Sequence, residues 1–301
     1  MEKVTILLST FNGEKYVAEQ IDSILNQSYK NIQIFVRDDV STDQTLPILE
    51  RLHRDGIIHL TKGKNIGVID SFFWLMKNAP LADFYAFCDQ DDVWKHDKIE
   101  KALSELHNYD INSPNLYCSS TELVDENLVS NQVGPVLKRL KPSLGNALVQ
   151  NIVTGCTAVF NRAALDKCIS VQPKRVEMHD SWIYLVCAAF GNVFFDTYPT
   201  VLYRQHSQNV IGGKTIGCYQ RFVRKFSILF NNPKKNFRSQ RANEFLELFP
   251  TEFETKELVG KIANYKYSWR NRLALITEKR IFMNRRDQDF IFRLSVLLGQ
   301  L

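Results

Sequence analysis

The chain lacks a hydrophobic segment long enough to cross a membrane, and it lacks a recognisable leader. The apolar run Trp182–Phe195 is too short, because a membrane-spanning helix needs about 20 consecutive apolar residues. Residues 1–9 enter a strand pattern directly and do not have the length of a signal sequence. These absences predict a cytoplasmic protein, and they leave association with the inner face of the cell membrane open.

Paired cysteines and glycine-rich loops are also missing. None of the six cysteines forms a C-x-x-C pair, which argues against a zinc site, and most lie in apolar runs typical of buried thiols in a reducing compartment. A nucleotidyltransferase would have a glycine-rich phosphate loop near its first strand, where this chain has only Gly13. The remaining composition, 301 residues with 45% hydrophobic and 24% charged residues, predicts a folded protein with a sizeable core.

Charge is distributed unevenly along the chain. Residues 214–301 contain 18 Lys+Arg and 8 Asp+Glu, whereas residues 1–213 contain 20 and 25. We therefore predict an acidic domain over residues 1–213 and a basic helical extension over residues 214–301. Basic amphipathic helices suit an anionic membrane surface; the alternative is a helical cap that packs on the domain or on a second subunit of a homodimer. Nucleic-acid binding is disfavoured, because the first domain is acidic and no recognition motif is present.

Apolar runs of strand length alternate with segments of helical spacing in the first part of the chain. The predicted strands cover residues 4–9, 32–36, 57–60 and 84–88. This alternation predicts an α/β fold with a mostly parallel sheet covered on both faces by helices. Ligands of such sheets bind beyond the carboxyl ends of the strands. The side chains that follow those ends should therefore converge: Thr10, Asp38, Asp39 and Asp89.

Beyond residue 114 the pattern is less regular. It predicts strands at residues 116–119, 156–160 and 201–204 and a buried helix at residues 181–190.

Three carboxylates lie within the four residues Asp89-Gln90-Asp91-Asp92. A divalent cation, Mn²⁺ or Mg²⁺, would remove their mutual repulsion, because hard cations take carboxylate oxygens and bridge them to substrate phosphates. The alternative is a solvated acidic turn that caps a helix beginning near Asp97. The apolar strand before the motif and Trp94 directly after it favour the cation site.

Two further acidic motifs have a functional and a structural interpretation. Asp38 and Asp39 suit the base or ribose of a nucleotide, or one of them caps the next helix, although Ser41 or Asp43 would cap it better. Asp180 follows His179 at the start of an apolar helix, where it either caps the helix or accepts a proton from an acceptor hydroxyl.

The motif Tyr203-Arg204-Gln205-His206 ends another predicted strand. Its guanidinium suits phosphate oxygens and its imidazole, when neutral, suits a metal.

Taken in order, these motifs resemble the family 2 glycosyltransferases with the A-type (GT-A) nucleotide-sugar fold. The resemblance covers residues 1–213 and rests on Ser9-Thr10-Phe11-Asn12-Gly13, Arg37-Asp38-Asp39-Val40-Ser41-Thr42-Asp43, Asp89-Gln90-Asp91-Asp92-Val93-Trp94, His179-Asp180 and Tyr203-Arg204-Gln205-His206. The Asp-Gln-Asp-Asp-Val-Trp form looks most like the bacterial rhamnosyltransferase branch, which builds cell-wall and capsular polysaccharide. It implies a Rossmann-like mixed, mostly parallel sheet flanked by helices, here with a helical C-terminal extension.

The resemblance also implies roles for the matching residues. Those facing the donor nucleotide would be Thr10, Asn12, Asp38, Asp39, Asp89 and Arg204. Asp91 would bind the divalent cation, Mn²⁺ or Mg²⁺, and His206 would bind the same cation or contact the diphosphate. Asp180 would be the catalytic base. The chain departs from the family pattern at Val40, where the family usually has glycine.

The acceptor side is predicted from weaker signals. Residues 151–157, with Gly155 and Cys156, resemble the family's acceptor loop, and the alternative is a strand with a close-packed glycine. Trp94 and Trp182 would either stack on an acceptor sugar or belong to the core.

The implied reaction is metal-dependent and inverting. It would transfer L-rhamnose from dTDP-β-L-rhamnose to a saccharide acceptor, which is often polyprenyl-linked in this family. The alternatives are a UDP-hexose or UDP-N-acetylhexosamine donor, or a nucleotide-sugar-binding protein without catalysis.

Overall fold

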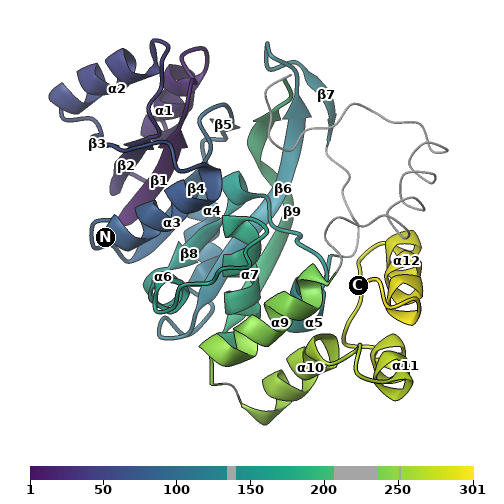
Figure 1. The fold of residues 1–301 in the computed structure, drawn as a ribbon. Coiled ribbons are helices and arrows are strands. Elements are labelled where there is room, and N and C mark those ends of the chain that lie inside the picture. Colours follow the sequence, from purple (N-terminus) through teal and green to yellow (C-terminus); the bar gives the residue numbers. More distant parts are fainter. Residues whose placement is uncertain (134–139, 207–235, 251) are drawn as a thin grey trace. The chain divides into compact units, whose positions relative to one another are not determined.

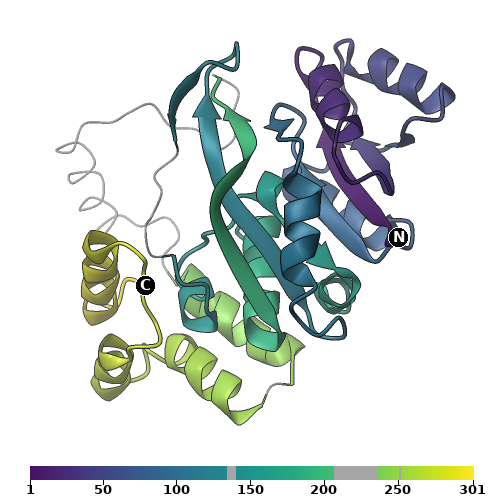
Figure 2. The ribbon, with the colours of Figure 1, turned by 180° about the vertical axis from the view of Figure 1, so that it is seen from behind.

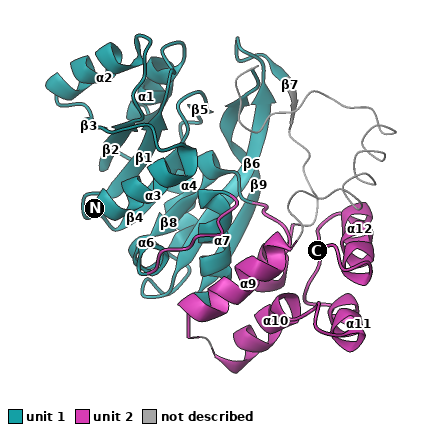
Figure 3. Ribbon diagram, viewed as in Figure 1, with its two compact units in different colours: residues 1–136, 153–170, 178–206 teal, residues 137–152, 171–177, 207–301 magenta. Residues whose placement is uncertain are grey.

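The computed structural model describes residues 1–133, 140–206, 236–250 and 252–301. The chain divides into two compact units (Figure 3), and both are discontinuous in sequence. Unit 1 comprises residues 1–136, 153–170 and 178–206, and unit 2 comprises residues 137–152, 171–177 and 207–301. The predicted boundary between residues 213 and 214 lies outside the described residues and stays a prediction.

Within the described residues, nine strands of unit 1 form one sheet (Figures 1 and 2) in the order β3-β2-β1-β4-β8-β6-β9-β5, with β7 paired to β6. The strands are β1 (Val4–Thr10), β2 (Ile32–Asp38), β3 (His59–Lys62), β4 (Phe84–Cys88), β5 (Val93–Trp94), β6 (Asn115–Val124), β7 (Ser130–Val133), β8 (Val159–Asn161) and β9 (Asn192–Arg204). Strands β1 to β4 are parallel, whereas β4–β8, β6–β8, β6–β7 and β5–β9 are antiparallel pairs and β6–β9 is parallel. The mixed α/β architecture predicted from the sequence is confirmed.

Helices cover both faces of this sheet. The helices of unit 1 are α1 (Val17–Leu25), α2 (Thr45–Arg54), α3 (Val68–Asn78), α4 (Lys98–Leu106), α6 (Arg162–Ile169) and α7 (His179–Phe190). Helix α1 buries Val17, Ile21 and Ile24 at helical spacing in one core with α4 and the alternate residues of β1. Helices α3, α6 and α7 pack on one another (Figure 1). Both faces of the parallel strands are therefore buried, which explains why their sequences read as unbroken apolar runs.

The irregular half of the sequence pattern was predicted less well. Strand β9 spans Asn192–Arg204, whereas only its last residues were predicted, because its pairing with β6 is interrupted by a register shift between Ser119 and Thr121. The predicted strand at residues 156–160 is instead a 3₁₀ turn, Gly155–Thr157, followed by the short β8.

Unit 2 contains α5 (Leu144–Ala147), α9 (Phe237–Leu248), α10 (Phe253–Ala263), α11 (Trp269–Thr277) and α12 (Arg286–Leu297). The helical character predicted for the extension is confirmed for the residues that the structure describes there, and residues 214–235 lie outside them. Across the described part of the chain, every helix is too short or too polar to span a membrane.

Candidate active site

Two loops that follow β1 and β2 are joined by hydrogen bonds. The Thr10 hydroxyl donates to Oδ1 of Asp38 at 2.9 Å, and the same carboxylate accepts the N–H of Ser41 at 2.9 Å and its hydroxyl at 2.6 Å. Asn12 donates its N–H to the Ser41 hydroxyl at 2.9 Å and accepts the N–H of Thr42 at 2.8 Å. Three residues predicted to face the nucleotide are thus brought together, and these bonds shape the loops around them.

Asp39 is buried and forms an ion pair with Arg37. Its Oδ2 also accepts the N–H of Ile66 at 3.3 Å, and Arg37 donates to the Lys64 carbonyl at 2.8 Å and to the Ser71 hydroxyl at 3.2 Å. The sequence placed Asp39 at the correct sheet edge, but it gave no signal that Arg37, two residues away, would be its partner.

Val40 has a φ angle of +64° and its side chain is exposed. A β-branched residue rarely adopts this left-handed conformation, which glycine adopts without strain. The chain therefore keeps the backbone geometry that glycine favours at this position, despite carrying valine there.

The side chain of Gln90 ties the turn after β4 to the loop after β1. Its Oε1 accepts the N–H of Phe11 at 2.8 Å, and its Nε2 donates to the Phe11 carbonyl at 2.9 Å. A Cβ atom at Gly13 would lie 2.3 Å from Oε1 of Gln90, so a larger residue there would displace the end of the Gln90 side chain. Gln90 was not singled out from the sequence, although its position inside the acidic motif was the available signal.

Asp91 and His206, the predicted metal ligands, lie in direct contact. Oδ2 of Asp91 is 2.7 Å from Nε2 of His206, and both side chains are partly accessible. The ring of Tyr16 lies 5.2 Å from the His206 ring, centroid to centroid. A carboxylate oxygen and an imidazole nitrogen that converge in this way fit a Mn²⁺ or Mg²⁺ ion.

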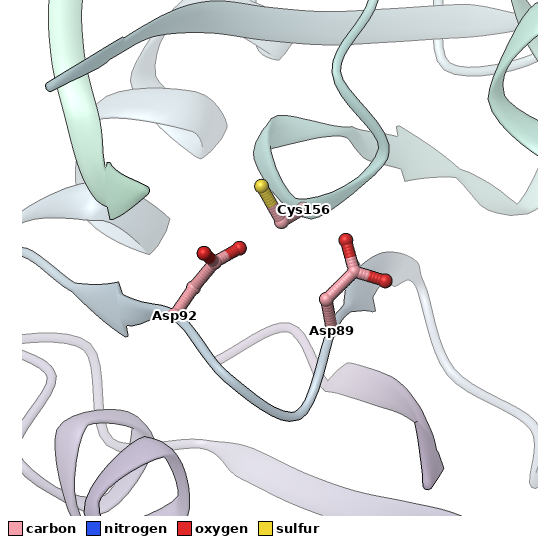
Figure 4. Close-up of side chains that lie close together, drawn as sticks. All are labelled: Asp89, Asp92 and Cys156. Atoms are coloured by element: carbon pink, nitrogen blue, oxygen red, sulfur yellow. The ribbon is translucent and has the colours of Figure 1, made fainter. Parts of the chain in front are cut away.

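Asp89, Asp92 and Cys156 turn their polar atoms toward one another (Figure 4), and these atoms all lie within 4.8 Å of each other. Burial, together with the nearby Asp91 charge, raises the pKa of Asp92 to about 7. Burial and the Asp92 charge raise the pKa of Asp89 well above its usual range. Hard cations prefer oxygen and imidazole ligands to a thiol, so this group fits Mn²⁺ or Mg²⁺ less well than the Asp91–His206 pair.

Asp180 lies in the first turn of α7 and is nearly buried. It is close enough to Asp89 for its charge to contribute to the raised pKa of that residue. A Cβ atom added to Gly155 would lie 3.8 Å from Cβ of Asp180 and 2.9 Å from Nε2 of His179. The predicted base, one donor-side aspartate and the predicted acceptor loop therefore lie close together, although they come from three separate stretches of sequence.

His179 has a structural role that was not predicted. Its ring stacks on Phe72 with a centroid separation of 3.8 Å and meets the edge of Phe87 at 4.7 Å. Burial lowers the pKa of His179 to about 3, so the ring is neutral in this apolar site.

Similarity to known proteins agrees with these observations. The model of the family described as Glycosyl transferase family 2 matches residues 5–169. The chain belongs to glycosyl transferase family 2. It is 32% identical to the dTDP-rhamnosyl transferase RfbG of Shigella flexneri over 218 residues, which cover 68% of this chain and 73% of RfbG.

Solved glycosyltransferase structures share the fold. The S. aureus TarS 1–349 structure in complex with UDP-GlcNAc has a TM-score of 0.59 at 16% identity, covering 99% of this chain and 82% of that one. The mannosyltransferase PcManGT from Pyrobaculum calidifontis, in complex with GDP-Man and Mn²⁺, has a TM-score of 0.53 at 15% identity, covering 99% of this chain and 86% of that one. The predicted family and fold are both confirmed.

In this glycosyltransferase the two tryptophans predicted to contact the acceptor belong to the core. Trp94 is 3% exposed and Trp182 is 2% exposed. Nζ of Lys98 lies 3.7 Å from the Trp94 ring centroid, and Nε1 of Trp182 donates to the Cys168 carbonyl at 3.5 Å. Neither indole offers a free face to a sugar, so the core alternative replaces the acceptor role for both.

Arg204 of the glycosyltransferase, predicted to face the donor, is also buried, and its guanidinium donates to protein oxygens. All the candidate residues lie in unit 1.

Proposed function

We propose that this glycosyltransferase transfers L-rhamnose from dTDP-β-L-rhamnose to a saccharide acceptor, with inversion at the anomeric carbon. The similarity to a dTDP-rhamnosyl transferase, at 32% identity over 218 residues, is the observation that carries the choice of donor. The Asp-Gln-Asp-Asp-Val-Trp form of the acidic motif supports the same choice. The product would enter a cell-wall or capsular polysaccharide.

Asp180 is the proposed catalytic base. Its carboxylate accepts the proton of the acceptor hydroxyl, whose oxygen attacks the anomeric carbon while the bond to the diphosphate oxygen breaks. The leaving group is dTDP. A single displacement inverts the anomeric centre, so the β-linked donor gives an α-L-rhamnoside. The proximity of Asp180 to Asp89 and Gly155 supports this assignment, because a base must reach both the donor sugar and the acceptor hydroxyl.

Asp91 and His206 are the proposed ligands of Mn²⁺ or Mg²⁺. The ion would stabilise the negative charge that develops on the departing diphosphate, so that no acid is needed to protonate the leaving oxygen. The Thr10–Asn12 loop and the Asp38–Asp39 pair would form the nucleotide side of the site. Their mutual hydrogen bonds hold the loops in shape before the donor arrives.

The acceptor is proposed to be polyprenyl-linked and reached at the inner face of the cell membrane. The start of α11 supports this location, since Tyr267 and Trp269 are 77% and 66% exposed and are flanked by the exposed basic residues Lys266 and Arg270. Exposed aromatic and basic side chains bind the headgroup region of anionic bilayers. The fraction of protein that sediments with anionic vesicles should fall in a Tyr267→Ser/Trp269→Ser double variant. An unchanged fraction would contradict the membrane contact. A dimer in solution would favour the homodimer alternative.

The decisive experiment compares donors. Binding and turnover should be measured with Mn²⁺ for dTDP-rhamnose, UDP-glucose, UDP-galactose and UDP-N-acetylglucosamine. We expect a preference of at least about tenfold for dTDP-rhamnose, or about 1.4 kcal/mol. Clear selectivity for a UDP-sugar would overturn the rhamnose assignment and leave the family membership intact. Donor binding without any transfer or hydrolysis would favour the non-catalytic alternative.

A further inference from the structure

We propose that Arg204 is a positioning residue that holds the Asp91–Asp92 turn in place, and that it is not a ligand of the donor diphosphate. The inference rests on the proposed function in one respect, because it takes Asp91 to be a metal ligand. It replaces the role that the sequence suggested for this arginine.

The contacts of Arg204 join it to both residues of the turn. Its Nε donates to the main-chain carbonyl of Asp91 at 2.9 Å, and its main-chain N–H donates to Oδ1 of Asp92 at 3.1 Å. One residue thus fixes the backbone of the turn at Asp91 and the side chain at Asp92. Two positions further along the chain, His206 contacts the carboxylate of Asp91.

The rest of the guanidinium is directed at protein oxygens in the turn after β6 and in α1. One terminal nitrogen donates to the main-chain carbonyl of Glu126, and the other forms an ion pair with the carboxylate of Glu19 in α1. The guanidinium carbon also lies 4.4 Å from the centroid of the Tyr16 ring. Turning this group toward a diphosphate would break several of these contacts at once.

The burial of Arg204 distinguishes a positioning residue from a diphosphate ligand. The Arg204 side chain is only 2% exposed, whereas that of its partner Glu19 is 50% exposed. A diphosphate ligand must be reachable by the donor, while a positioning residue need not be. The planar fork of arginine suits the task, because it presents several donors in fixed directions, which lysine does not.

The pairing of β5 with β9 places Arg204 beside the acidic turn. Strand β5 pairs with β9, with Val93 opposite Leu202, so the end of β9 runs beside the acidic turn. Arg204 is the last residue of β9. Its hydrogen bonds therefore fix the acidic turn relative to the sheet. The position of Asp91 in turn sets where the proposed metal would bind.

The test uses Arg204→Lys, Glu19→Gln and the double variant, with Asp22→Asn on the exposed side of the same helix as the matched control. Two quantities are measured: the Kd for Mn²⁺, from calorimetry or the electron paramagnetic resonance of the free ion, and the Kd for dTDP in the presence of a chelator. We expect Arg204→Lys to weaken Mn²⁺ binding by about tenfold, as loss of an outer-shell partner typically does, and to change metal-free dTDP binding by less than about twofold.

Glu19→Gln should weaken Mn²⁺ binding to a smaller extent, and the double variant should be no worse than Arg204→Lys alone, because Glu19 acts through Arg204. Should Arg204→Lys fail to fold, Glu19→Gln keeps the test, since its side chain is half exposed. A tenfold loss of metal-free dTDP binding with unchanged Mn²⁺ binding would overturn the proposal in favour of a diphosphate ligand. If the wild-type protein binds no Mn²⁺, both the positioning role of Arg204 and the metal role of Asp91 are overturned. Selectivity for another sugar would overturn only the rhamnose assignment.

Discussion

Nε2 of His206 lies 2.7 Å from Oδ2 of Asp91, although the two residues are 115 positions apart in the chain. The contact follows from the sheet, because the turn after β4 leads into β5, which pairs with the end of β9. The last residues of a strand far along the chain thereby reach the acidic motif. The pair offers one oxygen and one nitrogen ligand at the same point.

The first prediction concerns this pair. Asp91→Asn and His206→Ala should each weaken Mn²⁺ binding at least tenfold and lower kcat by about 10²-fold, because the first removes the charge of one proposed ligand and the second removes the other ligand. Calorimetry with Mn²⁺ and steady-state kinetics at saturating metal measure the two effects. His107→Ala, at an exposed histidine paired with Glu2, is the control. Normal Mn²⁺ affinity in both site variants would remove the pair as the metal site.

The second prediction separates chemistry from donor binding. Asp180→Asn removes the carboxylate charge with little change in shape, so kcat should fall by about 10² to 10⁴-fold while the Kd for the donor with Mn²⁺ stays within about threefold. Asp166→Asn, at an exposed carboxylate paired with Arg162, should behave as the wild type. Near-normal turnover in the Asp180 variant would exclude it as the base.

Gly155 provides a steric test of the same region. In Gly155→Ala the added methyl group meets Nε2 of His179 at 2.9 Å and Cβ of Asp180 at 3.8 Å, so the start of α7 must shift. We expect kcat to fall more than tenfold with Mn²⁺ affinity unchanged. Gly260→Ala is the control, since its Cβ would meet only Nδ2 of Asn264, at 3.8 Å. Equal kinetics for both variants would show that the 155–180 contact does not position the base.

Val40→Gly should stabilise the protein. At a φ of +64° valine is strained, and glycine relieves a cost of about 1 to 2 kcal/mol, from which its greater unfolded-state freedom subtracts about 0.5 to 1 kcal/mol. The melting temperature should therefore rise by about 2 °C. Val129→Gly, at another exposed valine without a positive φ, should not raise it. A lower melting temperature for Val40→Gly would mean that the valine side chain makes a compensating contact.

The acid sensitivity of the fold should depend on His179. Its pKa is about 3 in the folded protein and about 6.5 when unfolded, so the unfolded state takes up a proton first as the pH falls. The corresponding stability is complete above pH 6.5 and is lost progressively toward pH 3, by about 2 kcal/mol between pH 6.5 and pH 5. Denaturant unfolding of His179→Gln should show a shallower decline over this window, whereas His107→Gln should decline as the wild type does. Parallel curves for all three proteins would contradict the prediction.

The sequence predicted the sheet edge correctly and the contacts within it poorly. Strand ends are set by apolar runs that stop at polar residues, so Thr10, Asp38 and Asp89 were placed by local pattern alone. Whether a side chain at that edge faces a ligand or the protein depends on neighbours from distant elements. Such neighbours decide that Trp94 and Trp182 are buried, and they supply the partners of Asp39 and Arg204. A sequence motif carries no information about them.

The division of the chain has a consequence for how the protein is made. Unit 2 includes residues 137–152 and 171–177, which lie between segments of unit 1 in the sequence. There the Arg241 side chain donates to the carbonyls of Ala147 and Leu148, and the Glu244 carboxylate accepts the N–H groups of Lys174 and Arg175. During synthesis these main-chain groups leave the ribosome well before α9 exists. Residues 137–152 and 171–177 can therefore reach their final structure only after the C-terminal helices have been synthesised. A protein shortened at residue 206 would lack the partners of both segments.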